Sequence, residues 1–207
     1  MAKVSAELQN IYDKLYFEAS LVTLKWHNYK VLFAGSKEHL ELLKWAASAF
    51  FLTYNDAIVS DVFISLSRLT EEPKSKKGAR ISLGRLLLYI DPKVDNSFYK
   101  QFDKLVNEAK QNCFAILKHR NETVGHLNLQ TFLNSKIDAL PEITIKQVDL
   151  AIQSIQVVLT TFAAHIFNES HLFSPFIVDG DAVSLINRLL MSEKAYNDDI
   201  KRLQNEK

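Results

Sequence analysis

An arginine and a histidine lie six positions apart in the segment Arg120 to His126, which has the sequence RNETVGH. A phosphodiester cleaved by its own 2′-hydroxyl needs a group that transfers protons and a fixed cation that stabilises the phosphorane oxygens. Histidine suits the first role because its ordinary pKa of about 6.5 allows proton transfer near neutral pH. Arginine suits the second role because its guanidinium stays charged and can bind two phosphate oxygens. Asn121 could orient either side chain or bind the phosphate.

The spacing of this pair does not by itself establish a site. Residues six apart on an ideal helix are separated by about 240° and a rise of roughly 9 Å, so they do not share a face. A helix end or kink at Gly125, or a two-fold dimer, could bring Arg120 and His126 together. In the alternative interpretation, Lys118, His119 and Arg120 only complement the dipole of a helix C-terminus, and His126 caps a carbonyl.

Long helices must position this segment. Five glycines and four prolines in 207 residues leave few breaks, and this composition favours an all-α fold. Thr144 and Gln147 have the spacing of a capping box, which predicts a helix that continues to about residue 166. Apolar residues at helical spacing predict five further helices, over residues 8–33, 40–69, 83–90, 98–117 and 182–204. The expected N-caps of three of these helices are Ser36, Ser82 and Ser97.

Several breaks divide the pattern. Residues 70–80, TEEPKSKKGAR, are polar and predict a loop, residues 127–143 look irregular with Pro141 as a stop, and a further break precedes the last helix. We therefore expect an up-and-down bundle of about five or six helices. In this interpretation residues 1–170 form the bundle, and residues 171–207 are a C-terminal helical appendage of the same domain.

Charge and composition narrow the classes of protein. The net charge is +1, so any site for a polyanion must be a local patch. One cysteine, Cys113, excludes an internal disulfide and suits a reducing compartment. Continuous apolar runs are shorter than a membrane span requires, and residues 2–18 do not have the pattern of a signal peptide. We therefore expect a cytoplasmic protein. We also expect no metal site, since the spacing of Cys113 and His119 does not suit a pair of zinc ligands.

The segment RNETVGH resembles the signature of HEPN domains, in which an arginine, an adjacent polar residue and a histidine lie close to the end of a helix. Three further stretches resemble the abortive-infection U2-type branch of that superfamily: an aromatic first helix that ends in KVLFAG, and the segments ISLSRLTEE and ISLGRLL. The chain departs from the signature of this branch at two positions. Glu122 stands where a lysine is typical, and Gly125 stands where an alanine is typical.

The resemblance implies a helical bundle that dimerises and a metal-independent endoribonuclease without a cofactor, of a bacterial toxin–antitoxin or abortive-infection system. On this chain Arg120 and His126 would be catalytic, with Asn121 in support. RNA would be the substrate, and an antitoxin or regulatory protein is a further expected partner. The alternative is a catalytically inactive HEPN module that binds a partner protein or a nucleotide; the near-zero net charge and the missing cation at Glu122 favour it.

Five further cations are candidates for RNA binding. Phosphate contacts from lysine and arginine supply most of the sequence-independent affinity for nucleic acid. For Arg68, an ion pair with Glu71, Glu72 or Asp61 is the alternative, and for the loop lysines the alternative is simple solvation. The candidates are Lys118, His119, Arg68, Lys76 and Lys77.

Overall fold

The structure is a computed structural model that describes residues 5–75, 78–121, 142–170, 173 and 180–205. It confirms an all-α helical bundle. The chain divides into two compact units, which we describe separately. Unit 1 contains Met1–Thr23 and Ser60–Ser174, and unit 2 contains Leu24–Val59 and Pro175–Lys207.

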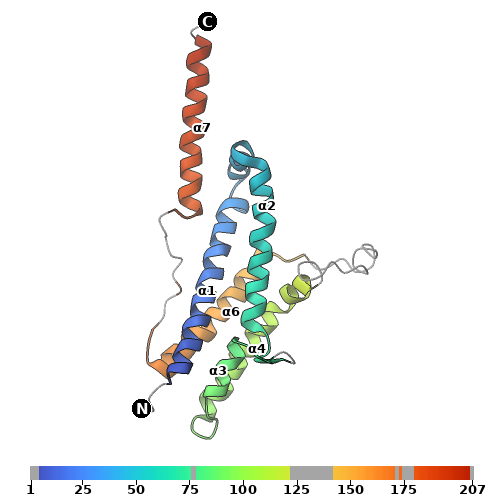
Figure 1. Ribbon diagram of the computed structural model, residues 1–207, viewed down its shortest axis with the longest axis vertical. Coiled ribbons are helices and arrows are strands. Elements are labelled where there is room, and N and C mark those ends of the chain that lie inside the picture. The colour runs from blue at the N-terminus through green and yellow to red at the C-terminus, as the bar shows by residue number, and fades with distance from the viewer. Residues whose placement is uncertain (1–4, 76–77, 122–141, 171–172, 174–179, 206–207) are drawn as a thin grey trace, which may run out of the picture. The chain divides into compact units, whose positions relative to one another are not determined.

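Two long helices, α1 (Ala6–Phe33) and α2 (Lys37–Thr70), are divided between the units: each has one part in unit 1 and the other part in unit 2. Unit 1 also contains the short helix α3 (Leu83–Leu86), the 3₁₀-helix η1 (Leu87–Tyr89) and the helices α4 (Asn96–His119) and α6 (Ile145–Phe162) (Figure 1). A π-helical turn, η3 (Ala163–Phe167), extends α6.

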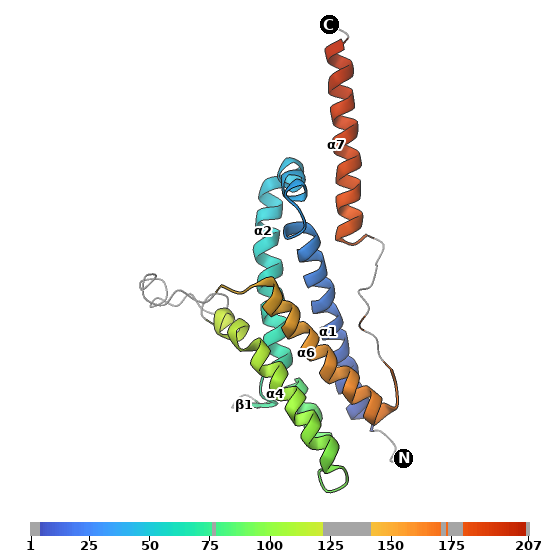
Figure 2. The same ribbon diagram turned by 180° about the vertical axis from the view of Figure 1, so that it is seen from behind.

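The core of unit 1 lies between α4 and α6, which pack side by side (Figure 2). Their apolar residues recur at helical spacing and are buried. Each fully buried large aliphatic or phenylalanine side chain contributes about 1.5–3 kcal/mol. Tyr12 of α1 joins this core, and its hydroxyl donates a hydrogen bond to the carbonyl of Leu159 at 3.3 Å. Burial raises the pKa of Tyr12 from its ordinary value of 10.0.

Helix starts in unit 1 follow capping chemistry, with two corrections to the sequence prediction. The capping box of Thr144 and Gln147 is present as predicted. The cap of α4, however, is Asp95 and not Ser97: its carboxylate accepts a hydrogen bond from the amide of Phe98 at 2.9 Å. Ser82 occupies the N-cap position of α3, but its buried hydroxyl makes no hydrogen bond within the described part of the chain.

The predicted loop over residues 70–80 contains a small hairpin. Strand β1 (Lys74–Ser75) pairs antiparallel with β2 (Gly78–Ala79). Gly78 has a φ of 121°, a conformation that side chains with a Cβ rarely adopt. The amide of Arg80 donates to the carbonyl of Pro73 at 2.9 Å, which closes the hairpin and fixes where Arg80 leaves it.

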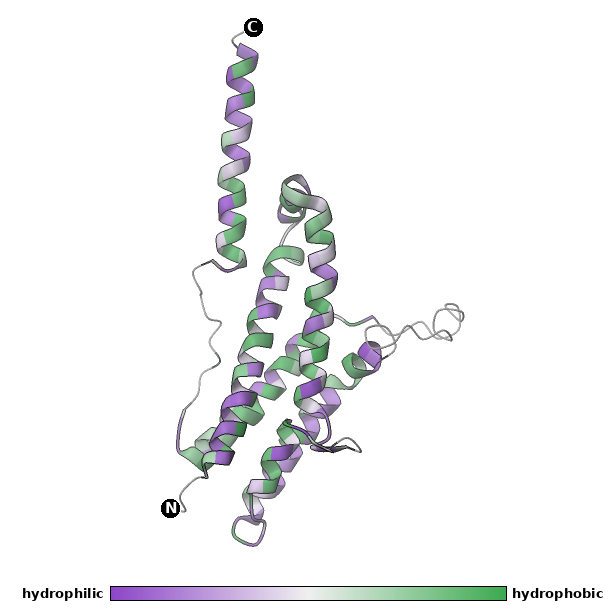
Figure 3. Ribbon diagram, viewed as in Figure 1, coloured by the Kyte–Doolittle hydropathy of each residue, from purple (hydrophilic) through white to green (hydrophobic). Residues whose placement is uncertain are grey.

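Unit 2 is built from the second part of α1, the first part of α2 and α7 (Ala182–Asn205). Ala47 has non-helical dihedral angles, so α2 consists of two helical pieces joined at a kink. The first turns of α7 belong to a small apolar core, and Figure 3 shows the helix becoming more hydrophilic towards its C-terminal end. The buried residues of this core are Leu32, Leu42, Leu43, Phe51, Ala182 and Ile186.

The turn between α1 and α2 confirms the predicted cap at Ser36. Gly35 follows the end of α1, where an added Cβ would lie 3.0 Å from the carbonyl oxygen of Val31. The Ser36 hydroxyl accepts a hydrogen bond from the amide of His39 at 3.2 Å, so Ser36 caps α2. A hydrogen bond from its own backbone amide, and a second one from the Ser36 side chain, lower the pKa of the Glu38 carboxyl.

Two of the described helices are long and apolar enough to cross a membrane by length and composition alone: Lys37–Thr70 and Ile145–Phe167. The sequence prediction considered only continuous apolar runs and therefore did not identify them. The hydropathy of α6 has a direct explanation in the fold, because its apolar residues form the core of unit 1.

Candidate functional site

Arg120 lies at the C-terminal end of α4, on the same side of the helix as its buried residues. Cys113 and Ile116 belong to the buried stripe of this helix, and a residue four positions after Ile116 lies on the same side. The amide of Arg120 continues the helical hydrogen bonds to Ile116 and Leu117. Its side chain is therefore turned towards the bundle, and only 23% of it is exposed.

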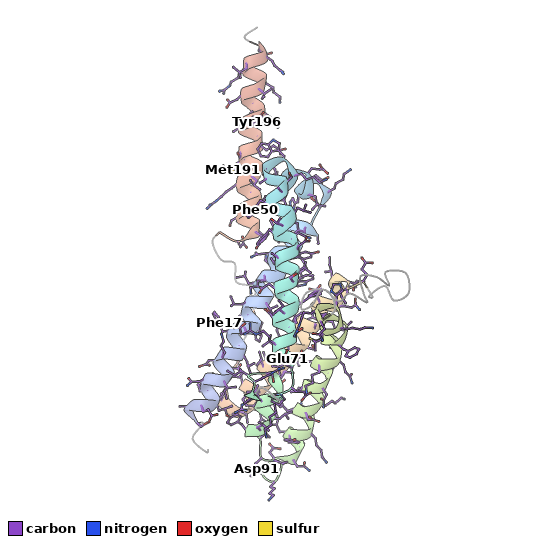
Figure 4. All side chains as sticks on the ribbon, turned by 45° about the vertical axis from the view of Figure 1, so that its right-hand side comes forward. Phe17, Phe50, Glu71, Asp91, Met191 and Tyr196 are labelled. Atoms are coloured by element: carbon purple, nitrogen blue, oxygen red, sulfur yellow. The ribbon has the colours of Figure 1, made fainter. Side chains whose placement is uncertain are left out.

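Glu71, directly after the end of α2, binds this guanidinium. Nη2 of Arg120 lies 3.0 Å from Oε1 of Glu71, and Nη1 of Arg80 lies 2.5 Å from Oε2 of the same carboxylate. The Glu71 side chain is 25% exposed, so its ion pairs are screened less than pairs at the open surface. One carboxylate thus joins two cations from different elements, the end of α4 and the hairpin. Figure 4 labels Glu71 at its place after α2.

The other N–H donors of the Arg120 guanidinium have no hydrogen-bond acceptor among the described residues. Its Nε is buried and has no hydrogen-bond partner there. An arginine side chain has five N–H donors, and the ion pair with Glu71 uses one of them. Buried donors normally find an acceptor. The arrangement therefore has capacity for a further acceptor close to Arg120.

A cleft of about 410 Å³ lies beside this cluster in unit 1. Lys14, Arg68 and Arg80 bring three positive charges to its wall, and Glu18 and Glu71 bring two negative charges. Lys14 is bound to Glu18 at 2.6 Å. Of the other charged groups of the lining, Glu71 and Arg80 are joined to each other, and Glu71 also binds Arg120. Leu15, Ser65, Leu69 and Ile81 complete the lining.

Arg68 is exposed and lines the cleft, but its expected ion pair is absent. Glu71 binds Arg80 and Arg120 instead, and Glu72 binds Lys110 at 2.7 Å. No ion pair to Arg68 is present among the residues that the structure describes. The alternative interpretation of Arg68 as a structural partner of these glutamates is therefore wrong.

The other predicted site residues are distributed unevenly. Lys118 and His119 form the last turn of α4, where Lys118 is exposed and His119 packs edge-on against Phe63 with ring centroids 5.5 Å apart. Asn121 is exposed next to Arg120. The predictions for His126, Lys76 and Lys77 lie outside the described residues, so the pairing of Arg120 with His126 stays a prediction.

Two residues of the cluster had no role of their own in the sequence prediction. From the sequence, Glu71 is only an alternative partner of Arg68, and Arg80 is only the last residue of the polar loop over residues 70–80. Charge type alone could not select them, because Glu71 and Arg120 are 49 residues apart in the chain. The stretch ISLSRLTEE, one of those that resemble the abortive-infection branch, did contain Glu71.

The cysteine does not belong to this site. Cys113 is buried in the stripe of α4, and burial raises its pKa from 9.0 to about 12, opposed in part by a hydrogen bond with Thr70. A thiol with so high a pKa is a poor nucleophile near neutral pH. Within the described ranges, no group of three or more histidine, cysteine, aspartate or glutamate side chains is placed to hold a metal ion.

Comparison with known proteins identifies the family. A sequence model of the HEPN family AbiU2 matches residues 5–185, which include the RNETVGH segment, Arg68, Glu71 and Arg80. No curated protein and no solved structure gives a significant match. Because the family match covers most of the 207 residues, the chain belongs to the AbiU2 family and is an abortive-infection-type HEPN domain.

Proposed function

We propose that the protein is a metal-independent endoribonuclease of a bacterial abortive-infection or toxin–antitoxin system, acting in the cytoplasm as a homodimer. The 2′-oxygen of RNA bonds to the adjacent phosphorus, and the bond from phosphorus to the 5′-oxygen breaks. His126 exchanges protons with the 2′-hydroxyl and the leaving 5′-oxygen. Arg120 stabilises the phosphorane, with Asn121 in support. The products carry a 2′,3′-cyclic phosphate and a 5′-hydroxyl.

The observation that supports this proposal most is the placement of Arg120. Its side chain is three-quarters buried, is held by Glu71 and is linked through that carboxylate to Arg80 on the cleft wall. A fixed cation with unsaturated donors suits a phosphate whose charge increases in the transition state. Membership of the AbiU2 family supports the same assignment for the segment that contains Arg120 and His126.

A second function is favoured by one feature of the same site. The carboxylate of Glu71 already neutralises part of the positive charge on Arg120, and Glu122 stands where the related signature has a lysine. A site with this balance would bind RNA weakly. It would suit a catalytically inactive module that binds a protein or a nucleotide.

Cleavage by the His126→Ala variant separates the two functions. The purified chain is incubated with RNA in the presence of EDTA, and the ends of the products are analysed for cyclic phosphate. We expect cleavage by the natural sequence and none by His126→Ala, with unchanged helical circular dichroism. His27→Ala is the matched control, because His27 is a half-buried histidine of α1 in unit 2. Equal cleavage by natural and His126→Ala proteins would rule out the assigned role.

The homodimer and the partner protein need separate tests. Light scattering coupled to gel filtration measures the mass of the chain in solution, and a monomer that cleaves RNA would exclude a site shared between two copies. Overproduction in bacteria tests the toxin role. The natural sequence should arrest growth, whereas His126→Ala should not, and co-expression of a neutralising protein should restore growth.

A further inference from the structure

We propose that Glu71 is a positioning residue, which holds Arg120 and Arg80 as a pair so that Arg120 binds the scissile phosphate and Arg80 binds a neighbouring phosphate. This inference rests on the proposed RNA cleavage. It assigns a phosphate-binding role to each of the two arginines that share the Glu71 carboxylate. It also implies that the RNA backbone runs along the cleft of unit 1.

The end of α2 fixes the backbone from which Glu71 projects. Leu69 and Thr70 are buried, with 3% and 4% exposure. The Thr70 hydroxyl donates to the carbonyl of Leu66 at 2.8 Å, and the Ser67 hydroxyl donates to the carbonyl of Phe63 at 2.7 Å. The last turn is thus anchored by packing and by side-chain hydrogen bonds. A carboxylate that follows such a turn directly has little freedom to move away from its partners.

The two oxygens of Glu71 are divided between two guanidinium groups. Oε1 accepts from Arg120 and Oε2 accepts from Arg80, so neither cation can turn away without leaving one oxygen unpaired. A partly buried carboxylate that loses a charged partner has lost a charge-assisted hydrogen bond, which is stronger than a neutral one. The position of each arginine therefore depends on the other through the shared anion.

The charge of the cluster still suits a polyanion. Arg80 and Arg120 carry two positive charges against the single negative charge of Glu71, and Arg68 adds a further cation on the cleft wall. Each guanidinium uses only one of its N–H groups in its bond to Glu71. The remaining donors are available for phosphate oxygens, which guanidinium groups bind in pairs.

The adjacent glutamate supplies a matched control. Glu72 also makes one ion pair, with Lys110 at 2.7 Å, but its side chain is 72% exposed and is not part of the cleft lining. Pairs at such exposed positions contribute little to stability. Replacing Glu72 changes the net charge of the protein by the same amount as replacing Glu71, and it leaves the two arginines of the cluster untouched.

The first measurement follows Arg120 itself and does not depend on cleavage. The Nε–H signal of Arg120 is assigned by nuclear magnetic resonance of ¹⁵N-labelled protein, as the signal lost in Arg120→Lys. We expect slow hydrogen exchange of this group in the natural protein and in Glu72→Gln. Glu71→Gln should exchange faster and show guanidinium rotation. Unchanged exchange in Glu71→Gln would overturn the inference whether or not the protein cleaves RNA.

The second measurement distinguishes positioning from competition with RNA. If Glu71 positions Arg120, Glu71→Gln lowers kcat by about 10- to 100-fold, as expected for a small displacement of a catalytic group, while KM stays unchanged. Glu71→Asp should recover part of the loss, and Glu72→Gln should have the kcat of the natural protein. A higher kcat or tighter binding of 2′-O-methyl RNA by Glu71→Gln would show that the carboxylate competes with RNA for Arg120, and would overturn the inference.

Arg80 is tested by binding. Its replacement by alanine should weaken binding of uncleavable 2′-O-methyl RNA and reduce the slope of log affinity against log salt by about one, as for the loss of one phosphate contact. Arg202→Ala, an exposed arginine of α7, is the control and should change neither quantity. Equal binding by Arg80→Ala and the natural protein would remove Arg80 from the site.

Discussion

The two units of the protein use their side chains in different ways. In unit 1, charged groups are joined across elements that are distant in the chain: Glu71 binds Arg120 and Arg80, and Glu72 binds Lys110. In unit 2, the ion pairs of Lys44 with Glu41 and of Arg202 with Asp199 each join residues of one helix, and large apolar groups such as Phe50 and Met191 are exposed (Figure 4). The comparison teaches that fixed polar geometry comes from contacts between distant elements, which unit 1 provides where Glu71 joins Arg120 to Arg80.

The hollows of the two units show the same contrast. The cleft of unit 1 is lined by five charged residues. Unit 2 has a hollow of about 520 Å³ whose wall is mostly aromatic and aliphatic, with Lys44 as its charged residue among those described. Phosphate binding requires cations in fixed positions, so these linings direct the search for RNA contacts to unit 1.

The largest expected effect compares two phenylalanines. Phe162 is fully buried in unit 1, whereas Phe50 is 60% exposed in unit 2. Phe162→Ala should lower the free energy of unfolding by about 3–5 kcal/mol, because it leaves a cavity in the core. Phe50→Ala should change it by no more than about 0.5 kcal/mol. Urea denaturation measures both, and equal losses would contradict the burial assigned to the two rings.

The next effect compares two arginines. Arg120→Lys should reduce kcat by about 10²–10³-fold, the loss typical of one donor to a developing oxyanion. A lysine keeps the charge but not the planar fork of donors. Arg202→Lys in α7 is the matched change at an exposed position and should leave kcat unaltered. RNA cleavage under single-turnover conditions provides the measurement, and a similar kcat for both variants would remove Arg120 from catalysis.

A smaller effect concerns alkaline stability, which the buried thiol of unit 1 should influence. The pKa of Cys113 is 9.0 without burial and about 12 in the folded protein, so its contribution is complete below pH 9 and is lost as the pH rises towards 12. Between pH 8 and pH 10, ionisation of the thiol in the unfolded chain should lower the free energy of unfolding by about 1 kcal/mol. Cys113→Ala should show a correspondingly flatter decline, measured by denaturation at each pH. An identical decline in both proteins would exclude the thiol as a cause.

The smallest effect is expected at Leu203, near the C-terminal end of α7, and Ile186 of the same helix is the buried reference. Ile186 is 3% exposed and belongs to the core of unit 2, whereas Leu203 is 63% exposed. Leu203→Ser should change the free energy of unfolding by less than about 0.5 kcal/mol, while Ile186→Ala should cost about 2–5 kcal/mol. Thermal denaturation of both variants tests the difference. A large loss for Leu203→Ser would mean that this end of the helix is covered in solution.

Much of the fold was predictable because helices are local. Apolar periodicity placed the main helices, and the spacing of Thr144 and Gln147 predicted a capping box that the structure contains. The cap of α4 was assigned two residues too late, because Asp95 and Ser97 are both good capping residues and local sequence does not distinguish them. The hairpin within residues 70–80 was missed because its strands are only two residues long.

The candidate site was less predictable than the fold. The motif segment identified Arg120, but its partner Glu71 comes from another helix, and no local pattern links residues 49 positions apart. Arg68 and Glu71 are close in sequence, which suggested an ion pair between them. In the structure the Glu71 carboxylate binds Arg80 and Arg120 instead, because tertiary packing places these two guanidinium groups beside it.

The small hairpin that presents Arg80 sets a limit on how this region can change. Its backbone bond from Arg80 to Pro73 spans only a few residues, so the number of residues between them determines where the guanidinium emerges. Adding or removing one residue there would preserve every charge yet displace Arg80 from Glu71. Segment length at this turn therefore acts as a functional variable in its own right, as decisive as the identity of the side chains it carries.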